Sequence, residues 1–316
     1  KGNDRTAVCC LSSLNLETYD EWKDEPQFIE DVMRFLDNVM SDFINKAPDT
    51  FKDAKYSAMR ERSVGLGVMG LHSFFQQKGI PFGSVMSKVW NQKIFKHIHE
   101  KANEASVKLA EERGPCPDAE EYGIKERFSN KTAIAPTASI SVICGGASPG
   151  IEPIAANSYT HKTLSGSFNV RNKYLAKVLD KYKKNNDETW SSITTNQGSV
   201  SHLDFLTPEE KDTFKTAFEI DQRWIIELGA DRTPFISQAQ SVNVFVPADI
   251  HKKDLQQIHF QAWKKGLKSL YYCRSKSIQR AENINSGSST DVTKNVYSNN
   301  DESNKEKDYE ECLSCQ

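Results

Sequence analysis

The sequence has no apolar run long enough to cross a bilayer, and no signal peptide opens it. It also has no marked excess of one charge, because 41 Lys and Arg residues stand against 43 Asp and Glu residues. A formal net charge of −2 argues against a nucleic-acid groove or a membrane surface as a partner. With 37% hydrophobic and 27% charged residues, we expect a globular protein of the cytoplasm.

An initiator Met is also lacking, and the opening KGNDRTAVCC resembles the middle of a domain. We therefore expect a fragment, or one piece of a protein made as two chains. A length of 316 residues suits one large α/β domain or two ordinary ones, and the sequence shows no internal repeat.

Zinc-ligand spacing is missing as well. The seven cysteines, without an export signal, indicate reduced thiols. Cys312 and Cys315 form one C-x-x-C, but no second such pair and no nearby His pair completes a zinc site. A redox dithiol is the favoured interpretation, with a zinc knuckle and chance proximity as alternatives.

The dithiol follows a segment that has almost nothing to bury. From about residue 281 the chain is rich in Asn, Ser, Asp, Glu and Lys. We expect residues 1–280 to fold and residues 281–316 to form a flexible tail. About 30 such residues have a root-mean-square span of roughly 30 Å, so the two thiols can reach well away from the point where the folded body ends.

Apolar periodicity and end signals predict the helices of the body. A stripe predicts a helix over residues 25–44, and a second runs over 85–112 before Gly114 and Pro115. Thr207 and the following Pro-Glu-Glu predict a helix from 207 to about 228. The members of the stripe are Phe28, Val32, Phe35, Leu36, Val39 and Phe43.

The end of the body has the pattern of a β-α-β unit. VNVFVP (242–247) predicts a strand, residues 251–266 predict a helix with Gly266 just past its end, and SLYYC (269–273) predicts another strand. Two strands joined by a helix favour a parallel sheet, and hence the α/β class.

The run Gly65–Gly70 matches G-x-G-x-x-G, the pattern of a dinucleotide-binding turn. That interpretation needs a strand before the glycines and an acidic residue about 20 positions later. The preceding KYSAMRERS is charged and helix-like, and the positions near 90 are KVWNQK. We expect residues 65–78 to form an apolar helix whose glycines allow close packing.

Three further stretches carry candidate chemistry. AVCCLSSLNL (7–16) places two adjacent cysteines in a strand-like apolar run, which more often serves packing. The small residues of PTASIS (136–141) leave N–H groups and hydroxyls for an anion, particularly if a helix begins there. Tyr271 and Tyr272 are adjacent on the expected strand, where both would be buried only under cover on both faces.

Together these residues resemble a known family. AVCCLSSLNLE, RSVGLGVMGLHSFF, PTASIS followed by GIEP, LKSLYYCRSK and the terminal C-x-x-C occur in one order. In this order they resemble the large, catalytic subunit of class I ribonucleotide reductase. The resemblance implies the C-terminal half of a ten-stranded α/β barrel with a flexible C-terminal tail. In that family a cysteine thiyl radical removes the 3′-hydrogen of a ribonucleoside diphosphate, and two cysteines then reduce the 2′ position.

The resemblance also implies roles for individual residues. Cys9 matches the second cysteine of the reducing pair, and Cys10 stands where the family usually has another residue, so which thiol reacts is open. Tyr271 and Tyr272 match the stacked pair that relays the radical from the small subunit. Cys312 and Cys315 match the mobile dithiol that re-reduces the active site. The substrate-phosphate loop comprises Pro136, Thr137, Ala138, Ser139, Ile140 and Ser141.

Other family features are absent from the sequence. They are the N-x-C-x-E stretch with the radical-bearing cysteine, the first cysteine of the reducing pair, the effector-specificity site and the ATP cone. The resemblance therefore implies partners: a chain with the N-terminal half, a small subunit with a dimetal–tyrosyl radical, and a thioredoxin- or glutaredoxin-like reductant. ATP and dNTP effectors belong to the absent part, and we expect no metal or other cofactor bound directly by this chain. A non-catalytic remnant that keeps the fold is the alternative, and a thioredoxin-like carrier is a more distant one.

Overall fold

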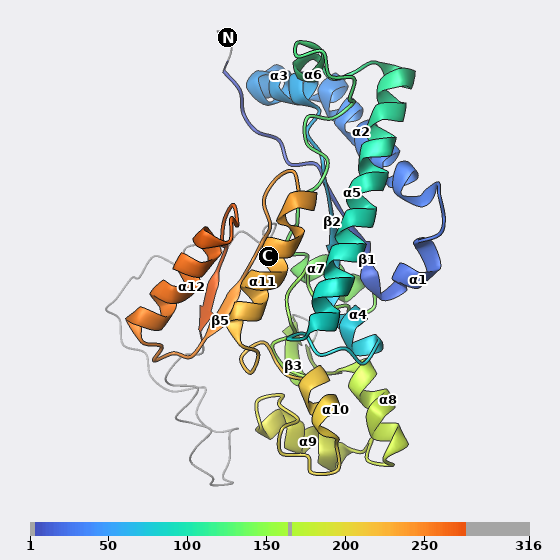
Figure 1. Ribbon diagram of the computed structural model, residues 1–316. Coiled ribbons are helices and arrows are strands. Elements are labelled where there is room, and N and C mark those ends of the chain that lie inside the picture. Colours follow the sequence, from blue (N-terminus) through green and yellow to red (C-terminus); the bar gives the residue numbers. More distant parts are fainter. Residues whose placement is uncertain (1–3, 164–165, 276–316) are drawn as a thin grey trace, which may run out of the picture.

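The computed structural model describes residues 4–163 and 166–275, which form a mixed α/β fold (Figure 1). The expected tail, with Cys312 and Cys315, lies outside the described residues. The strands are β1 Leu11–Asn15, β2 Gly65–Met69, β3 Ser158–Thr163, β4 Gly166–Arg171, β5 Val244–Val246 and β6 Cys273–Ser275. The α-helices are α1 Tyr19–Trp22, α2 Phe28–Lys46, α3 Lys52–Glu61, α4 Leu71–Gln77, α5 Val85–Arg113, α6 Pro117–Glu120, α7 Ala138–Ile143, α8 Lys173–Lys181, α9 Asp187–Thr195, α10 Pro208–Thr213, α11 Gln222–Arg232 and α12 Lys252–Lys264. Short 3₁₀ helices are η1 Leu16–Thr18, η2 Asp49–Phe51 and η3 Thr233–Phe235.

A parallel sheet runs through the centre of the fold. β1 pairs with β2, and β5 pairs with β6, both in parallel. Isolated parallel bridges join these pairs, because Leu66 pairs with Thr132 and Ile134 pairs with Gln240. The order across the sheet is thus β1, β2, residues 132–134, the segment leading into β5, and β6. The β-α-β unit at the end of the body is confirmed, with α12 between β5 and β6.

The sheet is open over the residues that the structure describes. In that part β1 pairs only with β2 and β6 only with β5, so each outer strand has an unpaired edge. The expected α/β class is confirmed, and the expected half of a barrel agrees with five parallel segments, whereas closure into a barrel is not seen. Unpaired edges of this kind favour pairing with another chain.

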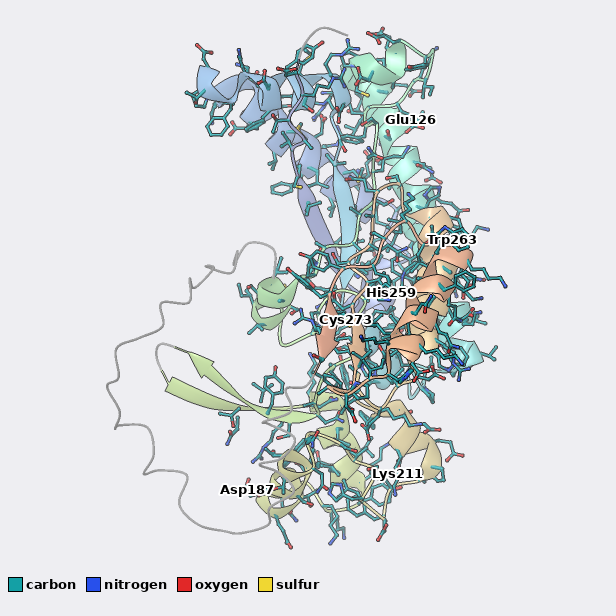
Figure 2. The ribbon with its side chains drawn as sticks, turned by 90° about the vertical axis from the view of Figure 1, so that its left-hand side faces the viewer. Glu126, Asp187, Lys211, His259, Trp263 and Cys273 are labelled. Atoms are coloured by element: carbon teal, nitrogen blue, oxygen red, sulfur yellow. The ribbon has the colours of Figure 1, made fainter. Side chains whose placement is uncertain are left out.

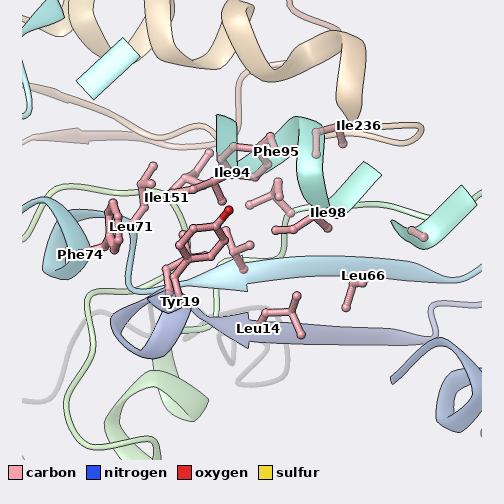
Figure 3. Packing of buried hydrophobic residues seen from close by; sticks show 14 of the residues in the cluster. Leu14, Tyr19, Leu66, Leu71, Phe74, Ile94, Phe95, Ile98, Ile151 and Ile236 are labelled. Atoms are coloured by element: carbon pink, nitrogen blue, oxygen red, sulfur yellow. The ribbon is translucent and has the colours of Figure 1, made fainter. Parts of the chain in front are cut away.

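The main core lies between the first two strands and α5 (Figure 3). Leu14 and Leu66 point from β1 and β2 toward Ile94 and Ile98 of α5, and all four are at most 4% exposed. Tyr19 fills the space beside them, and its hydroxyl lies 3.2 Å from Nδ1 of His97. Burial of each such aliphatic side chain stabilises the folded state by about 1.5–3 kcal/mol. This layer therefore holds β1 and β2 in place.

α2 buries most, but not all, of the expected apolar stripe: Leu36 is fully buried, and Phe28, Val32 and Phe43 are partly buried against the core. Its helix was predicted correctly, but Ile29, Met33, Leu36 and Met40 are the buried apolar residues. Phe35 and Val39 of the predicted stripe are 61% and 42% exposed. α2 has apolar residues on two faces, and contact with α5 and β1 decides which one is covered. The other face is left apolar and open.

The expectation of a helix over residues 65–78 is wrong in its first part. Residues 65–69 form β2, and the helix α4 begins only at Leu71. The neighbouring segment explains this, because a Cβ on Gly67 would lie 2.3 Å from the carbonyl oxygen of Ala133. The glycines do permit a close approach, as expected, but of strand to strand.

The predicted helix over 207–228 is two helices. Its start is confirmed, since the Thr207 hydroxyl accepts from the Glu210 N–H and the Glu210 carboxylate accepts from the Thr207 N–H. α10 ends at Thr213, and Asp221 caps the new helix α11 by accepting from the Arg223 N–H at 3.0 Å. The Ala217 N–H in the connection donates to the Ile154 carbonyl, which holds the break in place.

The last strand begins later than expected. β6 starts at Cys273, so Tyr271 and Tyr272 precede it instead of lying within it. The helices over 85–112 and 251–266 are confirmed as α5 and α12, and Gly266 has the left-handed φ of 78° expected past a helix end. The hairpin β3–β4, which extends from the body in Figure 2, was not predicted.

Candidate functional site

The PTASIS loop forms a turn at the end of a sheet segment. α7 begins at Ala138, directly after residues 132–134, and Thr137 before it has a left-handed φ of 56°. The Thr137 hydroxyl accepts from the Gly150 N–H at 2.6 Å, and the Ser141 hydroxyl donates to the Ala138 carbonyl at 3.2 Å. These two hydroxyls face inward, whereas Ser139 is exposed. The first N–H groups of a helix have no partner within it, so the start of α7 and Ser139 present donors outward.

A cavity of about 690 Å³ adjoins this turn. Ala138 of α7 lines it together with the 145–157 loop, the base of the hairpin β3–β4, the start of α8, and β5 and β6. Arg171, Lys173 and Arg274 contribute positive charge to the lining, and Glu152 contributes a carboxyl group. The volume is in the range of small-molecule sites. Arg171 pairs with Asp187 and Lys173 with Glu17, which offsets part of the positive charge of the lining.

A buried polar network forms one wall of this cavity. The fully buried His72 accepts from the Ile154 N–H at Nδ1, and burial lowers its pKa to about 3, so the ring is neutral. Asn172 donates to the side-chain oxygens of Gln76 and Asn157, at 2.9 and 2.8 Å. These bonds tie α4, the hairpin and α8 into one frame.

Tyr271 and Tyr272 are in ring contact. Their centroids are 4.1 Å apart and their planes meet at 50°. The rings are 41% and 46% exposed, so they are not core aromatics covered on both faces. Arg274 lies over the Tyr272 ring at 5.6 Å, and in Figure 2 the labelled Cys273 marks this strand beside α12. The alternation of a regular strand would separate the two rings, but they lie before β6.

Glu152 is a buried acid close to this pair. It is 7% exposed, and Oε1 accepts from the side-chain amide of Asn243. Burial raises the pKa of Glu152 to about 7, although the charge of Arg274 and the hydrogen bond from Asn243 lower it. Glu152, within GIEP, and Asn243, within VNVFVP, could not be assigned a role from the sequence. The one signal was a polar residue, Asn243, inside an otherwise apolar strand.

The raised pKa of Glu152 predicts a pH-dependent stability. Between its ordinary value of 4.5 and about 7 the folded protein binds a proton that the unfolded chain has released, so stability falls as pH rises through this window. Across this window the free energy of unfolding falls by about 3 kcal/mol, because each unit of pKa shift corresponds to about 1.4 kcal/mol. Glu152→Gln should remove this fall, as measured by urea unfolding at pH 5 and pH 8. The same slope in both proteins would contradict it.

Cys9 and Cys10 differ in exposure. Cys9 is exposed, whereas Cys10 is half-buried with Sγ 3.7 Å from the Leu36 carbonyl oxygen. Burial raises the pKa of Cys10, with the charge of Arg62 opposing that rise and the charge of Asp37 adding to it. Both precede β1, at the edge where the strands begin, whereas α7 follows a strand end. The structure therefore does not bring Cys9 next to the PTASIS loop.

We expect Cys9 to react with iodoacetamide at least about tenfold faster than Cys10, because Cys9 is exposed, whereas burial shields Cys10 and raises the pKa of its thiol. Rates of alkylation in Cys9→Ser and Cys10→Ser, followed by mass spectrometry, measure this, with the exposed Cys273 as the internal reference. Equal rates at the two positions would refute the assignment of Cys9 as the accessible thiol.

In the described part of the chain, no group of three or more His, Cys, Asp or Glu side chains is arranged to hold a metal ion. Within the same residues, no helix is both long and apolar enough to cross a membrane.

A parallel sheet that carries a tyrosine pair, an accessible thiol and a helix start beyond one of its segments defines this chain as an α/β protein with a candidate redox site. Residues 1–126 and 118–273 match the family model described as "Ribonucleotide reductase, barrel domain". The chain belongs to this family, as part of the barrel of a large subunit.

Individual relatives agree with this assignment. The chain is 48% identical to the ribonucleoside-diphosphate reductase large subunit of Invertebrate iridescent virus 6, over 97% of the chain and 33% of the relative. It is 43% identical to the ribonucleoside-diphosphate reductase large subunit of Invertebrate iridescent virus 3, over 90% of this chain and 46% of the relative. The structure resembles the Actinobacillus ureae class Id ribonucleotide reductase alpha subunit with a TM-score of 0.81 and 41% identity, over 87% of this chain and 51% of that one. The chain thus spans a third to a half of the relatives it matches.

Proposed function

We propose that this chain is the C-terminal catalytic part of a class I ribonucleoside-diphosphate reductase, which makes deoxyribonucleotides for DNA synthesis. It acts in a complex with a chain that supplies the preceding half of the barrel and with a small subunit. The observation that carries the proposal is the contact between Tyr271 and Tyr272 at a half-exposed position. A radical relay from another chain needs two phenols in contact and within reach of the surface.

Each residue has a role in this proposal. The dimetal–tyrosyl radical of the small subunit supplies the oxidising equivalent. Tyr271 and Tyr272 each lose one electron and one proton in turn and are then restored. Residues Pro136–Ser141 hold the substrate diphosphate through N–H and hydroxyl donors of the α7 turn, next to the cavity described above.

Cys9 then acts with a cysteine on the partner chain. The two thiols together give two electrons and two protons, the 2′-hydroxyl leaves as water, and a disulfide forms. Cys312 and Cys315 exchange with that disulfide and are reduced in turn by a thioredoxin- or glutaredoxin-like protein. ATP and dNTP effectors act on the preceding part of the enzyme.

Exposed apolar side chains support a partner chain. On α7, Ile140, Val142 and Ile143 are 44%, 56% and 84% exposed. Phe35 and Val39 on the outer face of α2 are also exposed, as described above. Together with the unpaired edges of β1 and β6, these surfaces are those that a second half of a barrel would cover.

Reconstitution tests the proposal. The chain is mixed with a chain carrying the preceding half and with the small subunit, and deoxynucleotide formation is measured after size-exclusion chromatography confirms the complex. We expect turnover only when all three are present. A complex that assembles and forms no product would instead support the remnant that keeps the fold without activity.

A further inference from the structure

We propose that Asn243 and Glu152 are positioning residues that hold Tyr271 and Tyr272 in ring contact, an inference that rests on the relay role proposed above. Neither side chain carries the radical. They act on the backbone that presents the rings.

The backbone at the tyrosines contains a β-bulge. In a regular parallel pair, one residue uses both its N–H and its C=O to bond the two residues flanking its partner. Here the Tyr271 N–H donates to the Val242 carbonyl at 2.9 Å, while the Tyr272 carbonyl accepts from the Val244 N–H at 3.0 Å. Two tyrosines therefore stand opposite the single residue Asn243. A bulge of this kind breaks the side-chain alternation, which explains how adjacent rings meet.

The bulge leaves one N–H without a place in the ladder, that of Tyr272. The Asn243 side-chain oxygen accepts it at 2.9 Å. Asn243 is only 1% exposed, so water does not readily take its place, and a buried N–H without an acceptor is costly. The Asn243 amide thus makes the bulged backbone stable where a straight strand would otherwise be favoured.

Glu152 fixes the direction of this amide. The Asn243 NH₂ group donates to Glu152 Oε1. A carboxyl oxygen accepts hydrogen bonds whether the group is protonated or ionised, and the Tyr272 N–H can only donate. Together they select the amide orientation in which the oxygen of Asn243 faces the Tyr272 N–H. Glu152 comes from the loop after α7, and Arg274 from β6 lies over the Tyr272 ring, so three segments converge on one tyrosine.

The test measures ring contact separately from turnover. 3-Fluorotyrosine at position 272 reports the ring current of its neighbour by ¹⁹F NMR on the full chain, with Tyr271→Ala as the reference for lost contact. In Asn243→Leu the new side chain has a similar volume but no hydrogen-bond acceptor. We expect the ¹⁹F resonance at position 272 to move in this variant to the position seen in Tyr271→Ala. In the reconstituted enzyme we expect turnover to fall about 100-fold, with KM unchanged.

Two variants separate positioning from general stability. Gln240→Leu removes another buried amide of the same segment, one that bonds Arg232 and Gly229, and should leave the resonance in place. Asn243→Asp combined with Glu152→Gln keeps both hydrogen bonds: residue 243 still accepts from the Tyr272 N–H, and only the bond between residues 243 and 152 exchanges donor and acceptor. This double variant should restore both contact and turnover. If Asn243→Leu does not fold, Glu152→Leu carries the same comparison, because it removes only the anchor of the amide.

An unmoved resonance in the folded Asn243→Leu or Glu152→Leu chain would overturn the positioning role, as would an equal movement in Gln240→Leu. Lost contact with parental turnover would leave the positioning role standing and refute the radical relay instead.

Discussion

In the reconstituted enzyme, either Tyr271→Phe or Tyr272→Phe is expected to abolish deoxynucleotide formation while assembly and thermal stability stay near those of the parent. Phenylalanine keeps the ring but lacks the phenolic proton and is much harder to oxidise. The structural cost is small because both rings are more than 40% exposed, so loss of a hydroxyl removes about 1 kcal/mol at most.

The matched control for this prediction is Tyr122→Phe. Tyr122 is 82% exposed and far along the chain from the pair, so the same chemical change there should leave turnover intact. Product formation and melting temperature are measured on all three variants. A tyrosine variant of the pair that turns over at the parental rate would eliminate the relay and return the pair to a surface-packing role.

Asp37→Ala is expected to lower the free energy of unfolding by about 3–5 kcal/mol, because it leaves buried arginines without their counter-charge. Asp37 is fully buried, and its carboxylate lies 2.6 Å from Arg62, 2.7 Å from Arg113 and 2.9 Å from Arg127. Burial opposes ionisation, but the hydrogen bond from Arg127 and the charge of Arg62 hold the pKa of Asp37 below its ordinary value. The cluster ties α2 to the ends of α3 and α5, near Cys10, which precedes β1.

The control is Asp42→Asn, which breaks an exposed ion pair with Lys46 on the same helix. The side chains of Asp42 and Lys46 are 60% and 77% exposed, so we expect this variant to lower the free energy of unfolding by less than about 0.5 kcal/mol. Urea unfolding measures both variants. A change below about 1 kcal/mol for Asp37→Ala would mean that water replaces the carboxylate at the arginines.

The elements that could be predicted from the sequence are those with local signals. α5 and α12 have apolar periodicity and a glycine at the end, and α10 has a capping box, so neighbours along the chain determine them. β2 could not be predicted in this way, because GLGVM is apolar in any conformation. Its backbone approach to Ala133, 66 positions after Gly67, makes it a strand.

The site shows the same division. The sequence alone pointed to the tyrosines, the PTASIS turn and the cysteines as candidate site residues. It also indicated that the turn would suit an anion if a helix began there. The contact between the rings was not derivable from alternation, since it depends on the amide of Asn243, which lies 29 positions before Tyr272. The choice of buried face on α2 likewise depends on α5 and not on α2 itself.

The pairing of the sheet has a consequence for how the chain folds. Leu11 pairs with Gly65, Leu66 with Thr132, and Ile134 with Gln240, so three of the four neighbouring contacts join residues 54, 66 and 106 positions apart. Such contacts require a long loop to close before any strand gains a partner, which slows folding. During synthesis β1 and the apolar β2 leave the ribosome well before the segment around Gln240 exists. We expect this chain to fold in seconds or slower, and to depend on chaperones or on early pairing with its other half to avoid aggregation in that interval.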